Sequence, residues 1–318
     1  MLTPKISRLV MGTRGSALAL AQSRQVAAAL HAAHPGLVVE ERIIRTTGDK
    51  LQSAPLPAIG GKGVFTKEIE DALLHSEIDF AVHSLKDLPP ELPDGLCIGA
   101  VPRRAPACDV CILQSEIQHP AFEVRLPFLP EGARVGTSSL RRRAQLLHLR
   151  PDLKIEDIRG NIDTRLRKLE EQPFNAIVLA RAGLQRLAIK SGKQIQVDLD
   201  ERECVPAPGQ GTLAIESRAR DERVLSILNT IEDAATRAEI IAERTAMRAL
   251  NAGCSTPLGA RAVADGEELR MWAVVLSPEG ARRIFAQDNG SVDHATEIGE
   301  RVARLLVERG AAELLPGL

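Results

Sequence analysis

Short apolar runs alternate with polar loops and helical stretches over most of the chain. The apolar run at 9–11 is followed by a glycine-containing turn, after which Ser16 is placed to cap a helix that extends to about His31. The next elements predicted are a strand at 38–45, a helix at 65–74 and a strand at 78–82. This alternation of strand, loop and helix is typical of α/β proteins.

The alternation continues after residue 106, and the helices there are basic. Strands are predicted at 134–135, 155–158, 176–179 and 212–216. A helix follows each of the first three strands and carries arginine. The loops between strand and helix contain glycine, serine or asparagine, which favour turns.

The last part of the chain has a different pattern. An amphipathic helix at 234–250 precedes runs such as 269–276, which predict antiparallel strands, and a final helix near 294–309. We interpret this part as a separate small domain. A chain of 318 residues is too long for one ordinary core, so two or three domains are expected.

Composition excludes several classes of function. Aromatic residues make up 2% of the chain, with no Tyr and one Trp, which argues against a stacking surface for single-stranded nucleic acid. The net charge of −1 gives no overall attraction for polyanions. The five cysteines, together with the lack of a recognisable signal peptide or membrane span, favour a reducing, cytoplasmic location.

Basic residues nevertheless gather locally. The stretch 134–168 holds ten Lys/Arg and four Asp/Glu residues. Across the chain, basic side chains recur just after predicted strands, where α/β proteins bind ligands. These are Arg14, Lys86, Arg141, Arg142, Arg159, Arg165 and Arg186, accompanied by the hydroxyl donors Ser16, Ser84, Thr137, Ser138 and Ser139. Because guanidinium groups match carboxylates, the set predicts a polyanion site; the alternative is ordinary surface ion pairs.

Phosphate is the obvious competing anion, but the motifs for it are missing. The run 60–63 lacks the glycine and Ser/Thr spacing of a P-loop. Two CxxC-spaced cysteines, Cys108 and Cys111, merge into an apolar run without a second pair, so no metal site is predicted.

Two further residues have chemical potential. Asp87 is an acid among anion-binding residues, a position that favours acid/base work or the stabilisation of a cation, although a helix N-cap is an open alternative. Cys254 lies in a Gly/Pro-bounded loop, where its thiolate can act as a nucleophile or simply be part of a small-residue turn. His83, which lies close to Asp87 in the sequence, is assigned no role.

Taken together, these motifs resemble those of the porphobilinogen deaminase (hydroxymethylbilane synthase) family. The matching segments follow one another in order along nearly the whole chain, which makes the set specific. They are Thr13–Ser16, Gly60–Phe65, Ala81–Asp87, Val135–Arg142, Arg159–Asn161 with Thr164 and Arg165, Gly209–Gly211, and Gly253–Cys254 with Pro257.

The resemblance implies an activity and a fold. The family condenses four porphobilinogen molecules head to tail, with loss of ammonia, on a dipyrromethane cofactor bound through a cysteine thioether, here Cys254. It implies two periplasmic-binding-protein-like α/β domains and a small C-terminal α+β domain. The corresponding boundaries are 1–104 with 208–230 for domain 1, 105–207 for domain 2 and 231–318 for domain 3.

The resemblance also implies residue roles. Asp87 would bind pyrrole N–H groups and stabilise cationic species. The cofactor would be held by Ser84, Lys86, Thr137, Ser138, Ser139, Arg141, Arg142 and Arg165. The substrate would be held by Arg14, Ser16, Arg159, Arg165 and Arg186, with Lys62 and Phe65 near the end of a lid at 46–63.

Some expectations remain open at this point. Residues 105–109 depart from the family pattern, so the family's hinge contacts do not carry over to them. The alternative to the enzyme is a non-enzymatic two-lobed binder of a polycarboxylate, which would need neither Asp87 nor Cys254 but would need an export signal. A monomer with no nucleic-acid or membrane partner is expected.

Overall fold

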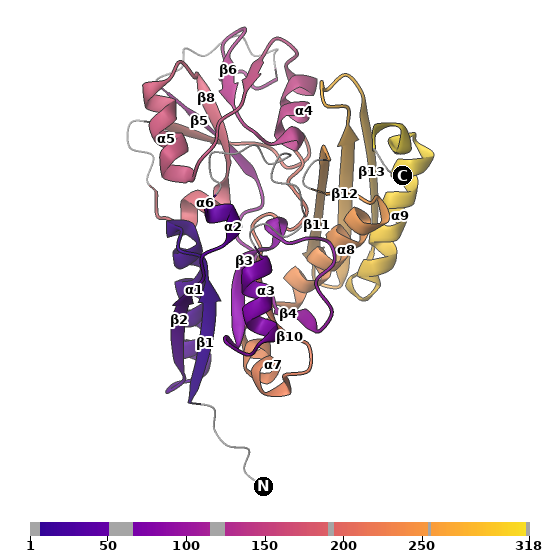
Figure 1. Ribbon diagram of the computed structural model, residues 1–318. Helices are drawn as coiled ribbons and strands as arrows, with labels where there is room; N and C mark the ends of the chain where they lie inside the picture. Colours follow the sequence, from indigo (N-terminus) through magenta and orange to yellow (C-terminus); the bar gives the residue numbers. More distant parts are fainter. Residues whose placement is uncertain (1–6, 51–65, 115–124, 190–193, 254–255, 316–318) are drawn as a thin grey trace. The chain divides into compact units, whose positions relative to one another are not determined.

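The chain folds into two compact units, neither of which is built from one continuous segment. The computed structural model describes residues 7–50, 66–114, 125–189, 194–253 and 256–315. One unit combines Met1–Arg104 with Thr212–Arg237, and the other combines Ala105–Gly211 with Ala238–Leu318 (Figure 1).

The first unit is built on a five-stranded sheet of order β2-β1-β3-β10-β4. Its strands are β1 (Arg8–Thr13), β2 (Val38–Ile43), β3 (Phe80–Ser84), β4 (Leu96–Ala100) and β10 (Leu213–Arg218). The strands β1, β2 and β3 are parallel, whereas β10 runs antiparallel to β3 and β4. The chain therefore inserts a late strand, β10, into a sheet that begins near the N-terminus.

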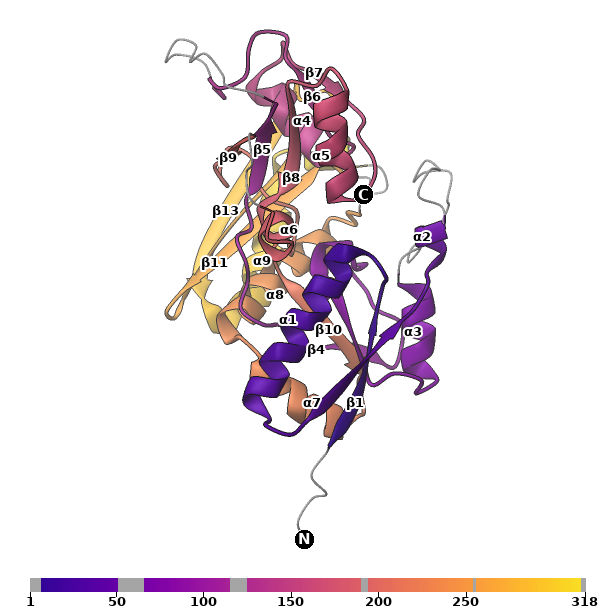
Figure 2. The ribbon, with the colours of Figure 1, turned by 90° about the vertical axis from the view of Figure 1, so that its left-hand side faces the viewer.

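Helices cover both faces of this sheet. The helices are α1 (Ala17–Ala33), α2 (Thr47–Lys50), α3 (Lys67–Leu74) and α7 (Glu222–Leu228), with 3₁₀ turns at Leu85–Asp87 and Asn229–Ile231. Leu9 and Met11 pack with α1 and α7, while Val10 between them packs with α3. Figure 2 shows α1 and α3 on opposite sides of β1, as the alternation of side chains along a strand requires.

The second unit contains another five-stranded sheet, of order β7-β6-β8-β5-β9. Its elements are β5 (Asp109–Leu113), β6 (Arg134–Gly136), α4 (Leu140–Leu149), β7 (Lys154–Glu156), α5 (Ile162–Glu171), β8 (Ala176–Ala180), α6 (Arg181–Arg186) and β9 (Ile195–Asp198). The strands β6, β7 and β8 are parallel, and β5 is antiparallel to β8 and β9. Helix α4 packs on one face and α5 with α6 on the other.

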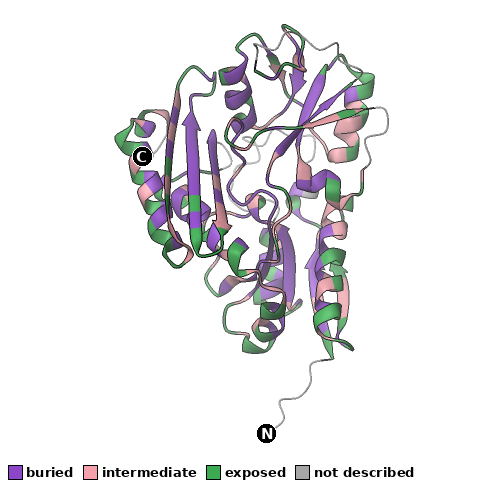
Figure 3. Ribbon diagram, turned by 180° about the vertical axis from the view of Figure 1, so that it is seen from behind, coloured by how far each residue is buried: buried purple, intermediate pink, exposed green. Residues whose placement is uncertain are grey.

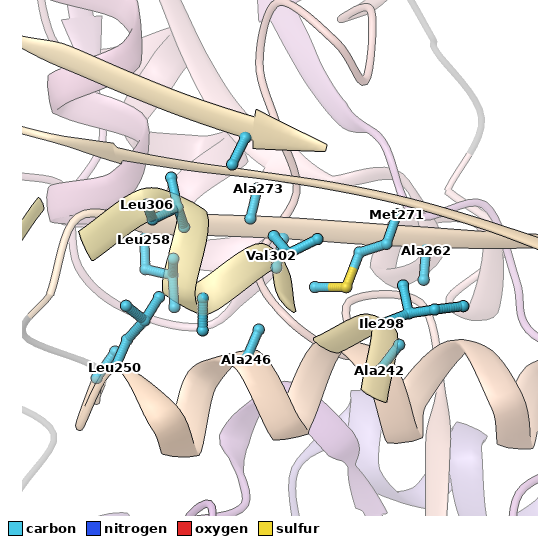
Figure 4. Packing of buried hydrophobic residues seen from close by; sticks show 14 of the residues in the cluster. Ala242, Ala246, Leu250, Leu258, Ala262, Met271, Ala273, Ile298, Val302 and Leu306 are labelled. Atoms are coloured by element: carbon cyan, nitrogen blue, oxygen red, sulfur yellow. The ribbon is translucent and has the colours of Figure 1, made fainter. Parts of the chain in front are cut away.

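The same unit includes a three-stranded antiparallel sheet of order β11-β12-β13. Its elements are α8 (Ala234–Ala249), β11 (Leu258–Asp265), β12 (Glu268–Leu276), β13 (Arg283–Ser291), α9 (Ala295–Glu308), and 3₁₀ turns at Val292–His294 and Ala311–Leu314. One face packs on α8 and α9 through residues such as Ala246, Met271 and Val302 (Figure 4). The other face packs Trp272 and Val274 against Ala144 of α4.

The structure confirms the predicted fold class, with two mixed α/β sheets and a C-terminal α+β part. The central strands of the sheets consist mainly of buried residues, whereas the helices include exposed residues (Figure 3). The strands β4 and β9 and helix α7, each of seven residues or fewer, were not predicted. The division into three domains with the boundaries given above stays a prediction.

Candidate active site

In the first unit, the candidate residues lie beyond the carboxyl ends of two neighbouring parallel strands. Because β1 pairs with β3 in parallel, the loop carrying Arg14 and Ser16 and the turn carrying Lys86 lie at the same sheet edge. Ser16 caps α1, as predicted, by accepting a hydrogen bond of 3.2 Å from the Ala19 N–H. Gln22 of α1 donates to Ser84 Oγ at 2.8 Å, which ties the two strand ends together.

Asp87 ends the 3₁₀ turn that follows β3. This turn spans Leu85–Asp87 and its N-cap position is Ser84, so Asp87 does not have the N-cap position that was its structural alternative. The side chain of Asp87 is exposed, whereas Leu85 in the same turn is buried. The buried leucine anchors the turn and leaves the carboxylate accessible. The catalytic role of Asp87 stays a prediction.

A buried polar cluster lies beneath this turn. His83 Nε2 of β3 is 3.0 Å from a carboxylate oxygen of Glu216 on β10, and both side chains are almost completely buried. Glu70 of α3 is also buried, and one of its carboxylate oxygens has no hydrogen-bond partner. Burial, reinforced by the nearby charge of Glu216, raises the pKa of Glu70 above its ordinary value. The sequence pattern gave no indication of this cluster.

In the second unit, the hydroxyl groups of 137–139 shape the loop between β6 and α4. Thr137 Oγ1 accepts from the Ser139 N–H at 3.2 Å, and Ser139 Oγ accepts from the Arg142 N–H at 3.4 Å as the α4 N-cap. Ser138 Oγ donates to the Ile158 carbonyl at 2.9 Å, which joins this loop to the one after β7. These bonds bring the loop that precedes Arg159 against the start of α4.

Arg141 and Arg142 both point at one buried acid, Asp109. Arg141 Nη1 donates to Asp109 Oδ2 at 2.7 Å, and Arg142 Nη2 donates to Asp109 Oδ1 at 2.9 Å. Burial alone would raise the pKa of Asp109, but the two guanidinium groups hold it well below its usual range. Residues 105–109 were considered from the sequence only for hinge contacts, and this acid was missed. A charged residue opening an otherwise apolar strand was the available signal, since a buried charge needs a partner.

Arg186 is in a different electrostatic situation. Its Nη2 donates to the Gly211 carbonyl at 2.6 Å, while its Nε is buried without a hydrogen-bond partner. Burial lowers the pKa of Arg186 to about 10. Among the described residues no carboxylate forms an ion pair with it, so this guanidinium is desolvated without a compensating negative charge.

The remaining candidates are only partly covered. Arg165 Nε donates to the Gly160 carbonyl at 2.8 Å, and Arg159 is half-buried. Lys62, Phe65 and Cys254 lie outside the described residues. On either side of Cys254, the Gly253 carbonyl accepts from the Thr256 N–H at 3.0 Å, so the described ends of that loop are joined.

The described cysteines offer no metal chemistry. Cys97, Cys108, Cys111 and Cys204 are free thiols. Burial raises the pKa of Cys204 to about 12 and that of Cys108 to about 11, which opposes thiolate formation. Within the described ranges no group of histidine, cysteine or acidic residues is arranged to hold a metal ion. Over the same ranges every helix falls short of the length and apolarity needed to cross a bilayer.

Comparison with known proteins decides the family. Residues 9–226 match the model "Porphobilinogen deaminase, dipyromethane cofactor binding domain", and residues 237–308 match "Porphobilinogen deaminase, C-terminal domain". The chain belongs to the porphobilinogen deaminase family. It is 46% identical over 97% of its length to the porphobilinogen deaminase of Rubrobacter xylanophilus, of which 96% is covered. It is 48% identical over 96% of its length to that of Desulforudis audaxviator, of which 96% is covered.

Family membership confirms the activity predicted from the sequence. The protein is a transferase that condenses four porphobilinogen molecules head to tail, with release of ammonia, on a dipyrromethane primer, and it yields the linear tetrapyrrole hydroxymethylbilane. These findings favour the enzyme over the non-enzymatic polycarboxylate binder. The described residues fit the cofactor, because cations such as Arg141, Arg142 and Arg165 can pair with its acetate and propionate groups.

Proposed function

We propose that the carboxylate-binding residues of this enzyme form two sets, one that holds the primer and one that holds the incoming substrate. The primer is assigned to Ser84, Lys86, Thr137, Ser138, Ser139, Arg141, Arg142 and Arg165, with its covalent bond at Cys254. The incoming porphobilinogen is assigned to Arg14, Ser16, Arg159, Arg165 and Arg186, with Lys62 and Phe65 at the edge of the site. Asp87 is the catalytic residue.

The observation that carries this proposal is the state of Arg186. Burial of a guanidinium group without a carboxylate partner costs free energy, because the lost hydration is not replaced by an ion pair. A substrate carboxylate at its unpartnered Nε would remove that cost and form a charge-assisted hydrogen bond. An ordinary structural arginine, such as Arg181 paired with Asp198, has its charge satisfied by the protein itself.

Asp87 is suited to the chemical step by its position. Dipyrromethane, when bound at Cys254, would supply the free pyrrole α-carbon to which the substrate becomes joined. The exposed carboxylate of Asp87 accepts a hydrogen bond from a pyrrole N–H and stabilises the positive charge that develops on the ring as the amine leaves. It also takes up and returns the proton that must move between ring carbon and amine. Lys86, next to Asp87 in the chain, binds a carboxylate of the primer and does not act on the reacting atom.

The organisation of the whole molecule forms part of the same proposal. We assign three domains, namely 1–104 with 208–230, 105–207 and 231–318, and place the enzyme in the cytoplasm as a monomer. The separate α8–β13 core supports the third domain. The free thiols at Cys97, Cys108, Cys111 and Cys204 are compatible with a reducing compartment.

Replacing Arg186 tests the substrate assignment. Arg186→Gln should raise the KM for porphobilinogen by about 10- to 100-fold, as expected for loss of one charged hydrogen bond. Its thermal midpoint should not fall, because a desolvated cation is removed. Arg181→Gln is the matched control from the same helix and should leave KM unchanged. Equal KM values for the two variants would remove Arg186 from the substrate site.

Intact mass tests the primer assignment. The purified enzyme should exceed its sequence mass by two pyrrole units, and Cys254→Ser should lose that excess while remaining folded. Cys97→Ser is the control, because Cys97 is a half-buried thiol on β4. Retention of the added mass in Cys254→Ser would assign the thioether to another residue.

A further inference from the structure

We propose that Asp109 is a positioning residue for the primer site. It fixes the direction of the Arg141 and Arg142 side chains and reduces the charge of this pair to a single positive charge. The inference rests on the proposed function, because it assumes that these two arginines hold carboxylates of the primer. No motif pointed to Asp109, which lies in a stretch that departs from the family pattern.

The first support is the number of donors that converge on Asp109. Its Oδ1 accepts from Arg142 Nε at 3.1 Å and from Gln210 Nε2 at 2.8 Å. Its Oδ2 accepts from Arg141 Nη1 and lies 3.7 Å from the Cys204 Sγ. The side chain is completely buried. Both carboxylate oxygens are therefore committed to neighbouring side chains within the same unit.

The second support is that each arginine has a further, fixed acceptor. Arg141 Nη1 also donates to the Val205 carbonyl at 2.8 Å. Arg142 Nη1 donates to the Val178 carbonyl on β8 at 3.0 Å. Each guanidinium is thus held between a carboxylate and a backbone carbonyl, and both side chains are nearly buried. Long flexible side chains fixed in this way lose little entropy when a ligand binds.

The third support is the charge balance. Two guanidinium groups share one carboxylate, so the cluster keeps one positive charge next to the N-terminal turn of α4. This residual charge, at the positive end of the helix dipole, favours one ligand carboxylate. An acid that only neutralised a surface arginine would form one ion pair and leave no excess positive charge.

The other end of α4 provides the contrast. Arg150 forms a two-point pair with Asp152, with both N–O distances 2.7 Å. Arg150 also donates to carbonyls of the preceding loop, including that of Leu129 at 3.2 Å. This Arg–Asp pair is balanced in charge and fastens a loop. It is a matched control for the loss of a close Arg–Asp pair on the same helix.

The test compares Asp109→Asn, Asp109→Glu and Asp152→Asn by steady-state kinetics and by intact mass after addition of limiting porphobilinogen. Asp109→Asn should lower kcat/KM at least about tenfold, the scale seen when a group that orients a ligand-binding side chain is removed. It should also reduce the fraction of protein that carries the primer and the fraction that carries added pyrrole units. Asp152→Asn should lower only the thermal midpoint.

If Asp109→Asn does not fold, Asp109→Glu provides the test of the positioning role. It keeps the charge but moves the carboxylate by one methylene, so a positioning role predicts a folded protein with reduced primer occupancy. Wild-type occupancy and kcat/KM in a folded Asp109→Asn or Asp109→Glu variant would overturn the proposal.

Arg141→Gln separates this inference from the function on which it rests. If Arg141→Gln loses primer while the Asp109 variants do not, the positioning role fails and the primer assignment stands. If Arg141→Gln retains wild-type primer occupancy and turnover, the primer assignment of Arg141 itself fails.

Discussion

Three arginine side chains of the second unit have different electrostatic surroundings. Arg141 and Arg142 share the carboxylate of Asp109, whereas Arg186 has only a backbone carbonyl and a pKa lowered to about 10 by burial. The charges of Arg141 and Arg142 are thus partly balanced within the protein, whereas among the described residues no carboxylate pairs with Arg186. An arginine motif in a sequence therefore does not tell which of these arrangements it forms.

The buried acids of the first unit show a similar contrast. Glu216 has His83 within ion-pair distance, while burial raises the pKa of Glu70 on the adjacent helix α3. A raised pKa in the folded state means that folding favours protonated Glu70. Its contribution to stability is complete below the ordinary glutamate pKa and is lost as the pH rises through the raised value.

Glu70→Gln should therefore change how stability depends on pH. The variant cannot ionise, so it should become more stable than the wild type as the pH increases from about 5 to 8, and the difference should shrink at the acid end. Urea unfolding midpoints measured across this range would show it. Glu77→Gln, an exposed acid just beyond the same helix, is the control. Parallel pH curves for Glu70→Gln and wild type would contradict this account.

At the scale of elements, a turn joins the C-terminal sheet to the helix that carries Arg141 and Arg142. Gly280 in the β12–β13 turn has a φ of +77° and lies against the backbone of α4, where an added Cβ would be 2.6 Å from the Ala144 carbonyl oxygen. The His148 ring also approaches the Gly280 carbonyl at 3.0 Å. Helix α4 is thus supported on this side by the small sheet.

Gly280→Ala should weaken the packing of the β12–β13 turn against α4. A methyl group there meets main-chain atoms that cannot rotate away, so the unfolding free energy should fall by roughly 1–3 kcal/mol more than in Gly266→Ala. Gly266 is the matched control, because it lies in the β11–β12 turn with a φ of +60° and nothing within 4 Å of the added Cβ. Chemical denaturation of both variants makes the comparison. Equal losses would show that backbone strain alone matters at Gly280.

The sequence allowed prediction of elements with strong local signals. Helix α1 begins after Ser16, and α8 spans Ala234–Ala249 close to its expected range. The strand expected at 78–82 instead forms over Phe80–Ser84, because Ile78 turns into the core beneath α3. Strand β4 was missed because its five residues are recognisable only by their pairing with β10.

At the scale of the molecule, the family and its chemistry could be predicted because ordered motifs cover nearly the whole chain. The positions of basic residues at strand ends followed from α/β architecture. Glu70 and Glu216 could not be found in this way, and for Asp109 the sequence indicated only that a buried charge needs a partner, because the partners lie far away in sequence. Asp109 meets Arg141, Arg142 and Gln210 only after three separate segments of the second unit have packed.

The position of β10 within the first sheet also determines the order in which the nascent chain can fold. Strand β4 pairs with β10, so it has no neighbour in its sheet until the ribosome has passed from Ala100 to beyond Arg218. The sheet of order β7-β6-β8-β5-β9 is complete as soon as Asp198 emerges. Translation therefore completes the second sheet before the first, and the N-terminal strands must wait, partly unpaired, for a segment made later.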